Sequence, residues 1–544
     1  MSLRNYLHSL ITPALNSEML FGNEPIVLEI PQQTSHGDFS TNIALLLAKK
    51  ANKNPRALAQ TIAASLQPDE AVIEKIEIAG PGFINFFFKK EYLANSLKDI
   101  FIQNESYGKS QKYIGKKANV EFVSANPTGP LTVGHGRNAV IGDTIAALLE
   151  WVGYSVDREY YFNNAGRQMR MLGDSVKLRY LQQLGDEFEF PEGHYQGGYI
   201  SDIAKQLLAE FGDSLRDEPV EGKFKEAAER EIFKELKGTL KRLGIEHKAF
   251  YNENSLYEEG KISSLLDHFQ KTGLSYEQEG AIWLKLAELG NDADKVIVKS
   301  TGEPTYRLPD IAYHITKFER GYDLIIDLFG SDHKATYPDV LAALKSLGYP
   351  VERVQVLIHQ FVTIIKDGEV VKMSTRKANY VTLDELVDEV GVDVTRYFFN
   401  MRSIGSHMNF DLDLAKKQSD ENPVFYLQYA HARICSIIRN AEEAGLESST
   451  DSLYILQSPE EQALIKELLL FPDVVLYAAE IFEAQKVTTY LREAAEAFHK
   501  FYTFCRIIGV EKNLSRARLS LAIAAKIVIS NGLRLLGVSA PERM

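Results

Sequence analysis

The stretch EFVSANPTGPLTVGHGRNAVIGD, from Glu121 to Asp143, decides the fold of the central part of the chain. Its apolar beginning predicts a strand that ends at Asn126, and Pro127 and Pro130 stiffen the loop that follows. A helical pattern begins at Gly134, where the first amides lack intrahelical partners and the helix dipole is positive. Because glycine lets a ligand approach the backbone closely, this helix start favours an anionic group.

Three interpretations of this turn are open. It can be no more than a tight strand-to-helix connection. It can be a dinucleotide-binding fingerprint built on Gly134 and Gly136, although its loop is long and contains proline. In that case Asp157 or Glu159 would bind the ribose. It can also be the phosphate-binding signature of nucleotidyl transfer, HxGH or TxGH, which here is TVGH at residues 132–135.

Short apolar runs alternate with amphipathic helices from about residue 109 to 404. NVEFVSA, YDLIIDLFGS and VQVLIHQFVTI are the expected strands. This alternation predicts an α/β domain around a parallel sheet, with ligands at the carboxyl ends of its strands. A charged helical part, about 175–250, is expected to be an insertion on this nucleotide-binding domain.

The sections on either side differ from the centre and from each other. Residues 1–108 combine a helical run with IEKIEIAGPGFINFFF, which predicts strand, turn and strand in an α+β domain. The polar SYGKSQKYIGKK after it is expected to be a linker. Residues 405–544 have helical periodicity and predict an all-α bundle. Three domains are therefore expected in 544 residues, since one core rarely organises so long a chain.

The composition limits the classes of protein that fit. Cys435 and Cys505 lie outside any CxxC pattern, which excludes a disulfide scaffold and a cysteine-rich zinc site and fits a reducing cytoplasm. The N-terminus lacks a signal-peptide apolar core, and LSLAIAAKIVIS is too short to span a bilayer, so a cytoplasmic protein is expected. The net charge of −13 argues only weakly against nucleic-acid binding, because a local basic surface remains possible.

A second motif, IIKDGEVVKMSTRKANYVTLDEL, lies far downstream. Asp367-Gly368 predicts a hairpin turn, and a helix is expected to begin near Thr382 or Asp384. The residues between them, KMSTRK, put three cations close to a serine, which suits the charge on a pyrophosphate leaving group. With the first loop, this segment resembles the KMSKS signature of class I aminoacyl-tRNA synthetases and favours the nucleotidyl-transfer interpretation.

The resemblance covers nearly the whole chain. ANPTGPLTVGHGR, YYFNNAGRQM, TYRLPDIAYH and LRLLGVSAPERM are together similar to the arginyl-tRNA synthetase family of the bacterial type. HGDFSTNIALLLAK and GPGFINF resemble its N-terminal domain, which binds the tRNA core, and residues 405–544 resemble its anticodon-binding domain. The resemblance implies a class I Rossmann-like catalytic domain and an arginine–tRNA ligase, which forms arginyl-adenylate from ATP and transfers arginine to the 3′-terminal adenosine of tRNA(Arg).

The resemblance also implies ligands and site residues. The substrates would be ATP with Mg²⁺, L-arginine and tRNA(Arg), bound by a cytoplasmic monomer that binds neither membrane nor DNA and holds no metal tightly. The residues implied in catalysis are Thr132, Gly134, His135, Lys372, Met373, Ser374 and Arg376. Further contacts to ATP are implied for Pro130, Gly136, Asn138 and Lys377.

Selection of arginine requires carboxylates, which accept the planar guanidinium fork in a way that an ammonium cannot match. The residues that match family positions at arginine are Glu121, Ser124, Asn126, Glu253, Tyr306, Asp310, Asp332 and His333. Asp310 can also be a helix N-cap before IAYHITKF. Phe83, Asn85 and Met544 match family positions at tRNA, and the amphipathic helix YLQYAHARICSIIRNA carries Tyr426, Tyr429, His431 and Arg433, a mixture that suits stacking and phosphate contact. For Phe83 and the tyrosines, burial is the alternative.

The chain departs from the family pattern at two motif positions. Thr132 stands where a histidine is common, and its hydroxyl can donate to phosphate but lacks the reach of an imidazole. Thr375 replaces the second lysine of the general signature, with Arg376 and Lys377 as substitutes. Two other functions therefore stay open. A small-molecule adenylyltransferase would suit TxGH but leaves the helical C-terminal section unexplained, and a catalytically silent RNA-binding relative is opposed by the intact His135.

Overall fold

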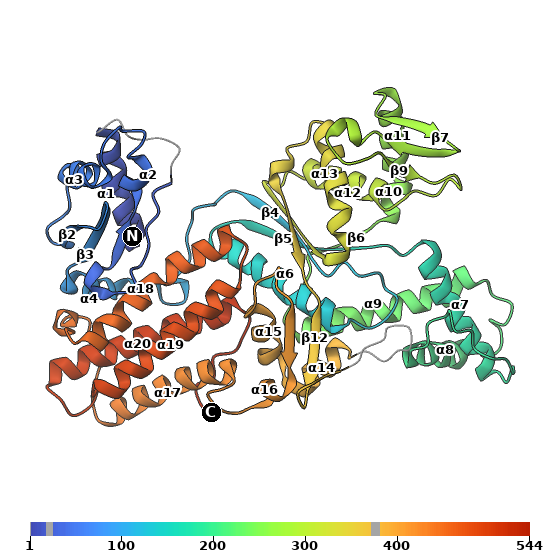
Figure 1. Cartoon of the computed structure of the whole chain (residues 1–544). Coiled ribbons are helices and arrows are strands. Elements are labelled where there is room, and N and C mark those ends of the chain that lie inside the picture. Colours follow the sequence, from blue (N-terminus) through green and yellow to red (C-terminus); the bar gives the residue numbers. More distant parts are fainter. Residues whose placement is uncertain (1, 18–24, 372–380) are drawn as a thin grey trace.

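The computed structural model describes residues 2–17, 25–371 and 381–544. Figure 1 shows a small N-terminal domain beside a C-terminal helical bundle, with the central part of the chain extending away from both. The elements of the N-terminal domain are α1 (Leu3–Ser17), β1 (Phe39–Thr41), α2 (Ile43–Leu47), α3 (Pro55–Ser65), β2 (Ile73–Ala79), β3 (Phe83–Phe88), α4 (Lys90–Ser96) and α5 (Lys98–Gln103).

The N-terminal domain is built on an antiparallel sheet of order β1-β3-β2. The expected strand, turn and strand is confirmed, because β2 pairs with β3 from Ala79↔Phe83 outward, around the glycines of GPG. The segment SYGKSQKYIGKK, which was expected to be a linker, is held by hydrogen bonds. Tyr113 donates to a carboxylate oxygen of Glu480 over 2.8 Å, and the carbonyl of Tyr107 accepts from Asn531 over 3.0 Å, so this segment is attached to the bundle.

The central part contains the expected parallel sheet and two additions. Its sheet elements and their helices are β4 (Lys117–Glu121), α6 (Val133–Trp151), β5 (Ser155–Phe162), β6 (Ala249–Asn252), α12 (Arg307–Glu319), β10 (Leu324–Gly330), α13 (Tyr337–Ser346) and β11 (Val354–His359). The helical insertion comprises α7 (Gly166–Gln183), α8 (Gly198–Phe211) and α9 (Lys225–Arg242). A second addition, which the sequence did not reveal, comprises α10 (Asn254–Glu258), α11 (Lys261–Lys271), β7 (Ser275–Gln278), β8 (Ala281–Leu284) and β9 (Lys295–Val298).

The five strands of the central sheet are parallel and lie in the order β11-β10-β4-β5-β6. Side chains alternate between the two faces of a strand. Phe122, just after β4, lies against α6, where a side chain at Gly142 would come within 2.3 Å of its ring. The neighbouring Glu121 faces α12 instead. The strand order therefore puts β4, and the loop that follows it, in the middle of the molecule.

The chain then leaves the sheet for the C-terminal bundle through a small mixed sheet. These elements are β12 (Val362–Lys366), β13 (Glu369–Val370), α14 (Leu383–Val390), α15 (Val392–Asn400), β14 (Met408–Asp411) and α16 (Leu412–Lys416). The predicted hairpin is confirmed, because Lys366 pairs with Glu369 and Asp367 has a φ of 53°. Thr382 caps α14 by accepting from the amide of Glu385 over 3.1 Å, which confirms the predicted helix start.

The predicted all-α section forms a bundle of long helices, α17 (Pro423–Glu443), α18 (Pro459–Glu480), α19 (Gln485–Phe504) and α20 (Lys512–Leu535). One buried guanidinium connects this bundle to the central part of the chain. Arg396 of α15 donates to the carbonyls of Leu536 and Leu243 over 2.8 and 2.7 Å, and it pairs with Asp143 of α6 over 2.7 Å. Within residues 2–17, 25–371 and 381–544, no helix is both long enough and apolar enough to cross a bilayer.

Candidate active site

A cavity of about 650 Å³ opens over the start of α6. The first motif forms one wall with Pro130, Thr132 and His135, and the insertion forms the other with residues 192–199. Gln168, at the start of α7, lines it as well. The two walls are attached to each other, since the Tyr199 hydroxyl donates to the Thr128 carbonyl over 2.7 Å. The sequence reasoning missed the 192–199 wall, although its mix of aromatic residues and glycines in HYQGGY was a readable signal.

Thr132 and His135 cap α6 reciprocally. Thr132 Oγ1 accepts from the His135 amide over 3.4 Å, and His135 Nδ1 accepts from the Thr132 amide over 3.2 Å. Burial lowers the pKa of His135, so its imidazole is neutral near neutral pH. Because Nδ1 accepts a hydrogen bond, the proton of the neutral ring is on Nε2. His135 therefore presents one N–H donor, together with the free amides at the positive end of α6.

The glycines of the first motif have two different roles. A side chain at Gly136 would come within 2.4 Å of Leu383, so packing against α14 accounts for a glycine at this position. Gly134 has more space, with Thr132 Oγ1 as its nearest neighbour at 3.7 Å. The expected contact of Gly136 with ATP stays a prediction, and Gly134 remains a candidate for close approach.

The second motif meets the first directly after its cationic part. Thr382 pairs with Thr132 as an isolated antiparallel bridge, and the Leu383 amide donates to the Leu131 carbonyl over 2.8 Å. Lys372, Met373, Ser374, Arg376 and Lys377, for which phosphate contacts are expected, lie outside the described residues. The described residues that follow them are therefore joined to the loop that begins α6.

Three carboxylates form a row across the central sheet. Glu121 on β4 is paired in register with Glu159 on β5 and with Asp327 on β10. All three are buried, with exposed fractions of 3%, 0% and 0%. Three buried negative charges side by side are unfavourable unless cations and hydrogen-bond donors compensate them.

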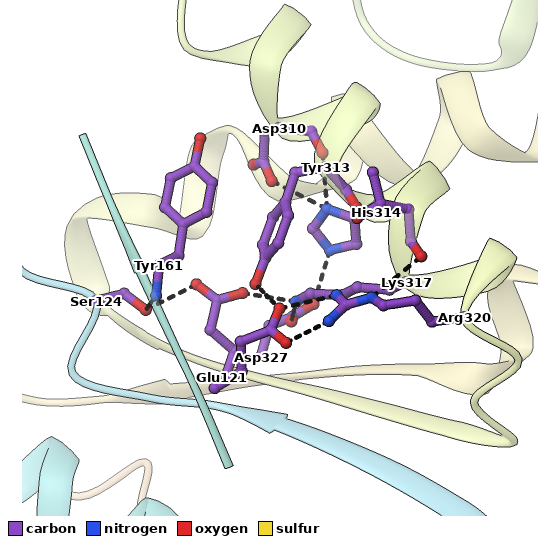
Figure 2. A network of polar contacts seen from close by, with 11 residues as sticks. Glu121, Ser124, Tyr161, Asp310, Tyr313, His314, Lys317, Arg320 and Asp327 are labelled. Atoms are coloured by element: carbon purple, nitrogen blue, oxygen red, sulfur yellow. Dashed lines mark hydrogen bonds and ion pairs between the residues drawn. The ribbon is translucent and has the colours of Figure 1, made fainter. Parts of the chain in front are cut away.

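Helix α12 supplies this compensation from one face (Figure 2). Lys317 Nζ lies 2.6 Å from Glu121 and 2.5 Å from Asp327, and it stands 4.4 Å from the centre of the Tyr313 ring. Arg320 pairs with Glu159 through both terminal guanidinium nitrogens. Burial favours the neutral form of Asp327, but Lys317 and His314 outweigh it and lower the pKa of this carboxyl. Since Glu159 is fully engaged here, it is not free to bind a ribose, which removes it from the dinucleotide interpretation.

The residues expected at arginine come together around this row. Glu121 accepts from the Ser124 hydroxyl over 2.9 Å, and Ser124 accepts from the Tyr161 amide over 3.1 Å. The Tyr161 hydroxyl donates to Glu253 over 2.8 Å, and Asn163 donates to the other oxygen of Glu253 over 2.8 Å. Burial raises the pKa of Glu253, because it disfavours the charged carboxylate. A cationic ligand bound beside this side chain would stabilise that charge.

The loop after β4 has a strained backbone. Val123 and Ser124 have φ values of 68° and 44°, which are unusual for residues other than glycine and costly for a β-branched one. Asn138 holds this loop in place. Its Oδ1 accepts from the Val123 amide over 2.6 Å, and its Nδ2 donates to the Leu328 carbonyl over 2.9 Å. Asn138 thus supports the loop through both ends of its side-chain amide, and the expected contact of Asn138 with ATP stays a prediction.

The other arginine candidates lie at different positions relative to the network. Asn126 donates to Gln168 over 2.9 Å and accepts from the Asn163 amide over 3.0 Å, which places it between the cavity and Glu253. Tyr306, at the start of α12, is 84% exposed. Asp332 and His333 lie in a 3₁₀ turn, Ser331–Ala335, directly after β10.

The structure divides the predicted tRNA contacts into exposed and buried groups. Tyr429 is 39% and Met544 56% exposed. Tyr426 and Phe83 are half-buried, and Arg433 lies 4.6 Å from the centre of the Tyr502 ring. Two predicted contacts are internal instead. Asn85 is 3% exposed and accepts from the Ser40 hydroxyl over 2.7 Å, and His431 is 2% exposed and binds the Pro541 carbonyl over 2.9 Å. Both side chains therefore bind groups inside the protein. Strand and helix periodicity alone cannot tell a buried polar residue from an exposed one.

In the part of the chain that the structure describes, three or more histidine, cysteine, aspartate or glutamate side chains are nowhere grouped so as to hold a metal ion. The carboxylate row is occupied by Lys317, Arg320 and His314 instead.

Comparisons with known proteins agree over the whole length. Family models match at residues 5–88 (arginyl tRNA synthetase N terminal domain), 96–399 (tRNA synthetases class I (R), catalytic domain) and 427–544 (DALR anticodon binding domain). The chain is 50% identical over 565 residues to an arginine–tRNA ligase of Salinibacter ruber, and 51% identical over 552 residues to one of Chlorobium phaeovibrioides, each match covering 100% of both chains. The arginyl-tRNA synthetase of Thermus thermophilus has the same fold, with a TM-score of 0.80 at 23% identity over 100% of both chains.

Proposed function

Because this chain belongs to the arginyl-tRNA synthetase family and is an arginine–tRNA ligase, we propose which of its residues carry the two steps of that reaction. In the first step a carboxylate oxygen of L-arginine attacks the α-phosphorus of ATP. The bond to the bridging oxygen breaks, and pyrophosphate leaves with its electron pair. In the second step a ribose hydroxyl of the tRNA terminal adenosine attacks the arginyl carbonyl and AMP leaves.

For the first step, the cavity over the start of α6 is proposed to hold ATP, which arrives with Mg²⁺. The carrying observation is that a neutral, Nε2-protonated His135 and the positive end of α6 face the same cavity as Thr132. They would stabilise charge on the phosphates by position, without a protein nucleophile. Lys372, Ser374 and Arg376 are proposed to complete the phosphate contacts, with Met373 and Lys377 beside them.

For arginine, the proposed guanidinium partners are Asp310 and Glu253, with Tyr306 beside them. Ser124 and Asn126 are proposed at the α-amino and carboxylate end. Glu121 has both carboxylate oxygens engaged, by Ser124 and Lys317, so its proposed part is to hold Ser124 in place. Asp332 and His333, just after β10, remain proposed contacts to arginine.

For tRNA, the proposed contacts are the half-buried and exposed residues Phe83, Tyr426, Tyr429, Arg433 and Met544. Aromatic rings next to a guanidinium suit stacking on unpaired bases and phosphate contact. The enzyme is proposed to act as a cytoplasmic monomer. A small-molecule adenylyltransferase would leave the bundle without a role.

The first test of this proposal is arginine-dependent exchange of pyrophosphate into ATP, with and without tRNA(Arg). From the family resemblance we expect exchange only with tRNA. Exchange without tRNA would keep the ligase but remove the coupling to the tRNA-binding domains. Absence of exchange from protein that still binds tRNA would instead support a catalytically silent relative.

Thr132→Ala is expected to lower the exchange rate about 10-fold with little change in the KM for arginine. The change removes one hydroxyl at the phosphates and a helix cap, which is worth about 1 kcal/mol. Thr132→Ser is the matched control, because it keeps both the hydroxyl and the cap. An unchanged rate in Thr132→Ala would exclude Thr132 from the mechanism, and equal losses in both variants would point to the lost methyl group.

A further inference from the structure

A buried imidazole close to the proposed arginine site has no role in the assignments above. His314 lies on α12 one turn after Asp310, and its side chain is 4% exposed. Its Nδ1 is 3.0 Å from Asp310 Oδ1 and 2.8 Å from the Asp310 carbonyl oxygen, and its Nε2 is 2.8 Å from Asp327 Oδ2. All of these partners are acceptors, so both ring nitrogens donate, and only an imidazolium can do this.

The surrounding charges agree with that geometry. Burial on its own lowers the pKa of His314, but the negative charges of Asp327 and Asp310 outweigh it and raise the pKa to about 10. Lys317, a cation on the same helix, is itself paired with Asp327 and Glu121. The imidazole is therefore charged near neutral pH.

Asp310, His314, Asp327, Lys317 and Glu121 form one unbroken chain of ion pairs in which the sign of the charge alternates (Figure 2). The chain has three carboxylates and two cations, so one negative charge is unmatched. The four inner members have side chains 0–4% exposed, whereas that of Asp310 is 29% exposed. The unmatched charge therefore faces outward at Asp310, where a cationic side chain can reach it.

We propose that His314 is a positioning residue that determines selectivity for the guanidinium group, acting through Asp310. The assignment rests on the proposed function and deepens it. Through the contact to Oδ1, at 3.0 Å, His314 restrains the orientation of the Asp310 carboxylate. A planar donor fork needs a carboxylate in a fixed plane, whereas a compact ammonium does not. His314 thus favours arginine over a lysine-like cation without touching either.

The test is His314→Gln, which introduces a neutral polar side chain and so removes the charge and the second donor. The KM for arginine is expected to rise about 10- to 100-fold in tRNA-dependent pyrophosphate exchange, with kcat and the KM for ATP within about 3-fold. The relevant comparison is a cycle with Asp310→Asn. If His314 acts through Asp310, the double variant has a KM for arginine within about 3-fold of that of Asp310→Asn alone.

A merely structural role predicts different results. The two effects would then multiply in the double variant, the KM for ATP would rise as well, and affinity for tRNA(Arg) would fall. Any of these would overturn the assignment, as would an unchanged KM for arginine in His314→Gln.

A second variant covers the case in which His314→Gln does not fold. Asp327→Asn removes the charge that holds the His314 ring from its other side, so His314 should bind and orient Asp310 less firmly. The variant is expected to raise the KM for arginine about 10-fold, and an unchanged KM would overturn the assignment. Wild-type protein without arginine-dependent exchange would instead overturn the proposed function itself, so the two failures can be told apart.

Discussion

Lys317→Met is expected to lower the free energy of unfolding by about 3–5 kcal/mol, which is the usual cost of removing one partner from a buried ion pair. Lys317 has no exposed side-chain surface and forms ion pairs with both Glu121 and Asp327. Methionine fills a similar volume but leaves two buried carboxylates with one cation fewer. The melting temperature should fall on the order of 5–10 °C, measured by thermal denaturation near neutral pH.

The destabilisation by Lys317→Met should be smaller at pH 5 than at pH 7.5. Without Lys317 the pKa of Glu121, which burial already raises, should rise further. A carboxyl whose pKa is raised in the folded state destabilises that state above this pKa, and the penalty disappears as the pH falls through it. Lys345→Met, on the exposed side of α13, is the matched control and should change stability by less than about 0.5 kcal/mol. Equal losses in the two variants would mean that the carboxylate row does not depend on Lys317.

His135→Ala is expected to reduce kcat for arginine-dependent pyrophosphate exchange about 10²- to 10³-fold, with the KM for arginine changed by less than about 3-fold. The variant loses the Nε2 donor that faces the cavity and the acceptor that holds the Thr132 amide. Both changes affect the proposed phosphate contacts, whereas the carboxylate network at the proposed arginine site is unchanged. Single-turnover formation of the adenylate is the measurement that isolates this step.

His135→Gln is the informative companion, because its amide can place a donor near the position of Nε2. It should retain about 10-fold more activity than His135→Ala if donation to phosphate is the role of the ring. His268→Ala, an exposed histidine on α11, should leave the rate unchanged. A full rate in His135→Ala would remove this residue from the chemistry and leave the α6 terminus as the phosphate site.

The sequence by itself determined the features that depend on neighbouring residues. The parallel sheet follows from apolar runs alternating with helices, the β12–β13 hairpin from Asp367-Gly368, and the α14 start from Thr382 and its capping partner Glu385. The start of α6 was predicted at Gly134, one residue after its observed first residue, Val133. Turn chemistry, capping and periodicity act over a few residues, so a single sequence is enough to reveal them.

The tertiary structure decided everything that depends on register between distant segments. Glu121, Glu159 and Asp327 become one row only because three parallel strands align at those positions, and a shift of one residue would point the side chains to the other face. The same holds for the insertion wall at residues 192–199 and for Leu383, whose packing explains Gly136. Asn85 and His431 were predicted to contact tRNA, but both are buried, where they bind Ser40 and Pro541. Local patterns specify which groups a segment offers, and long-range packing selects which of them meet.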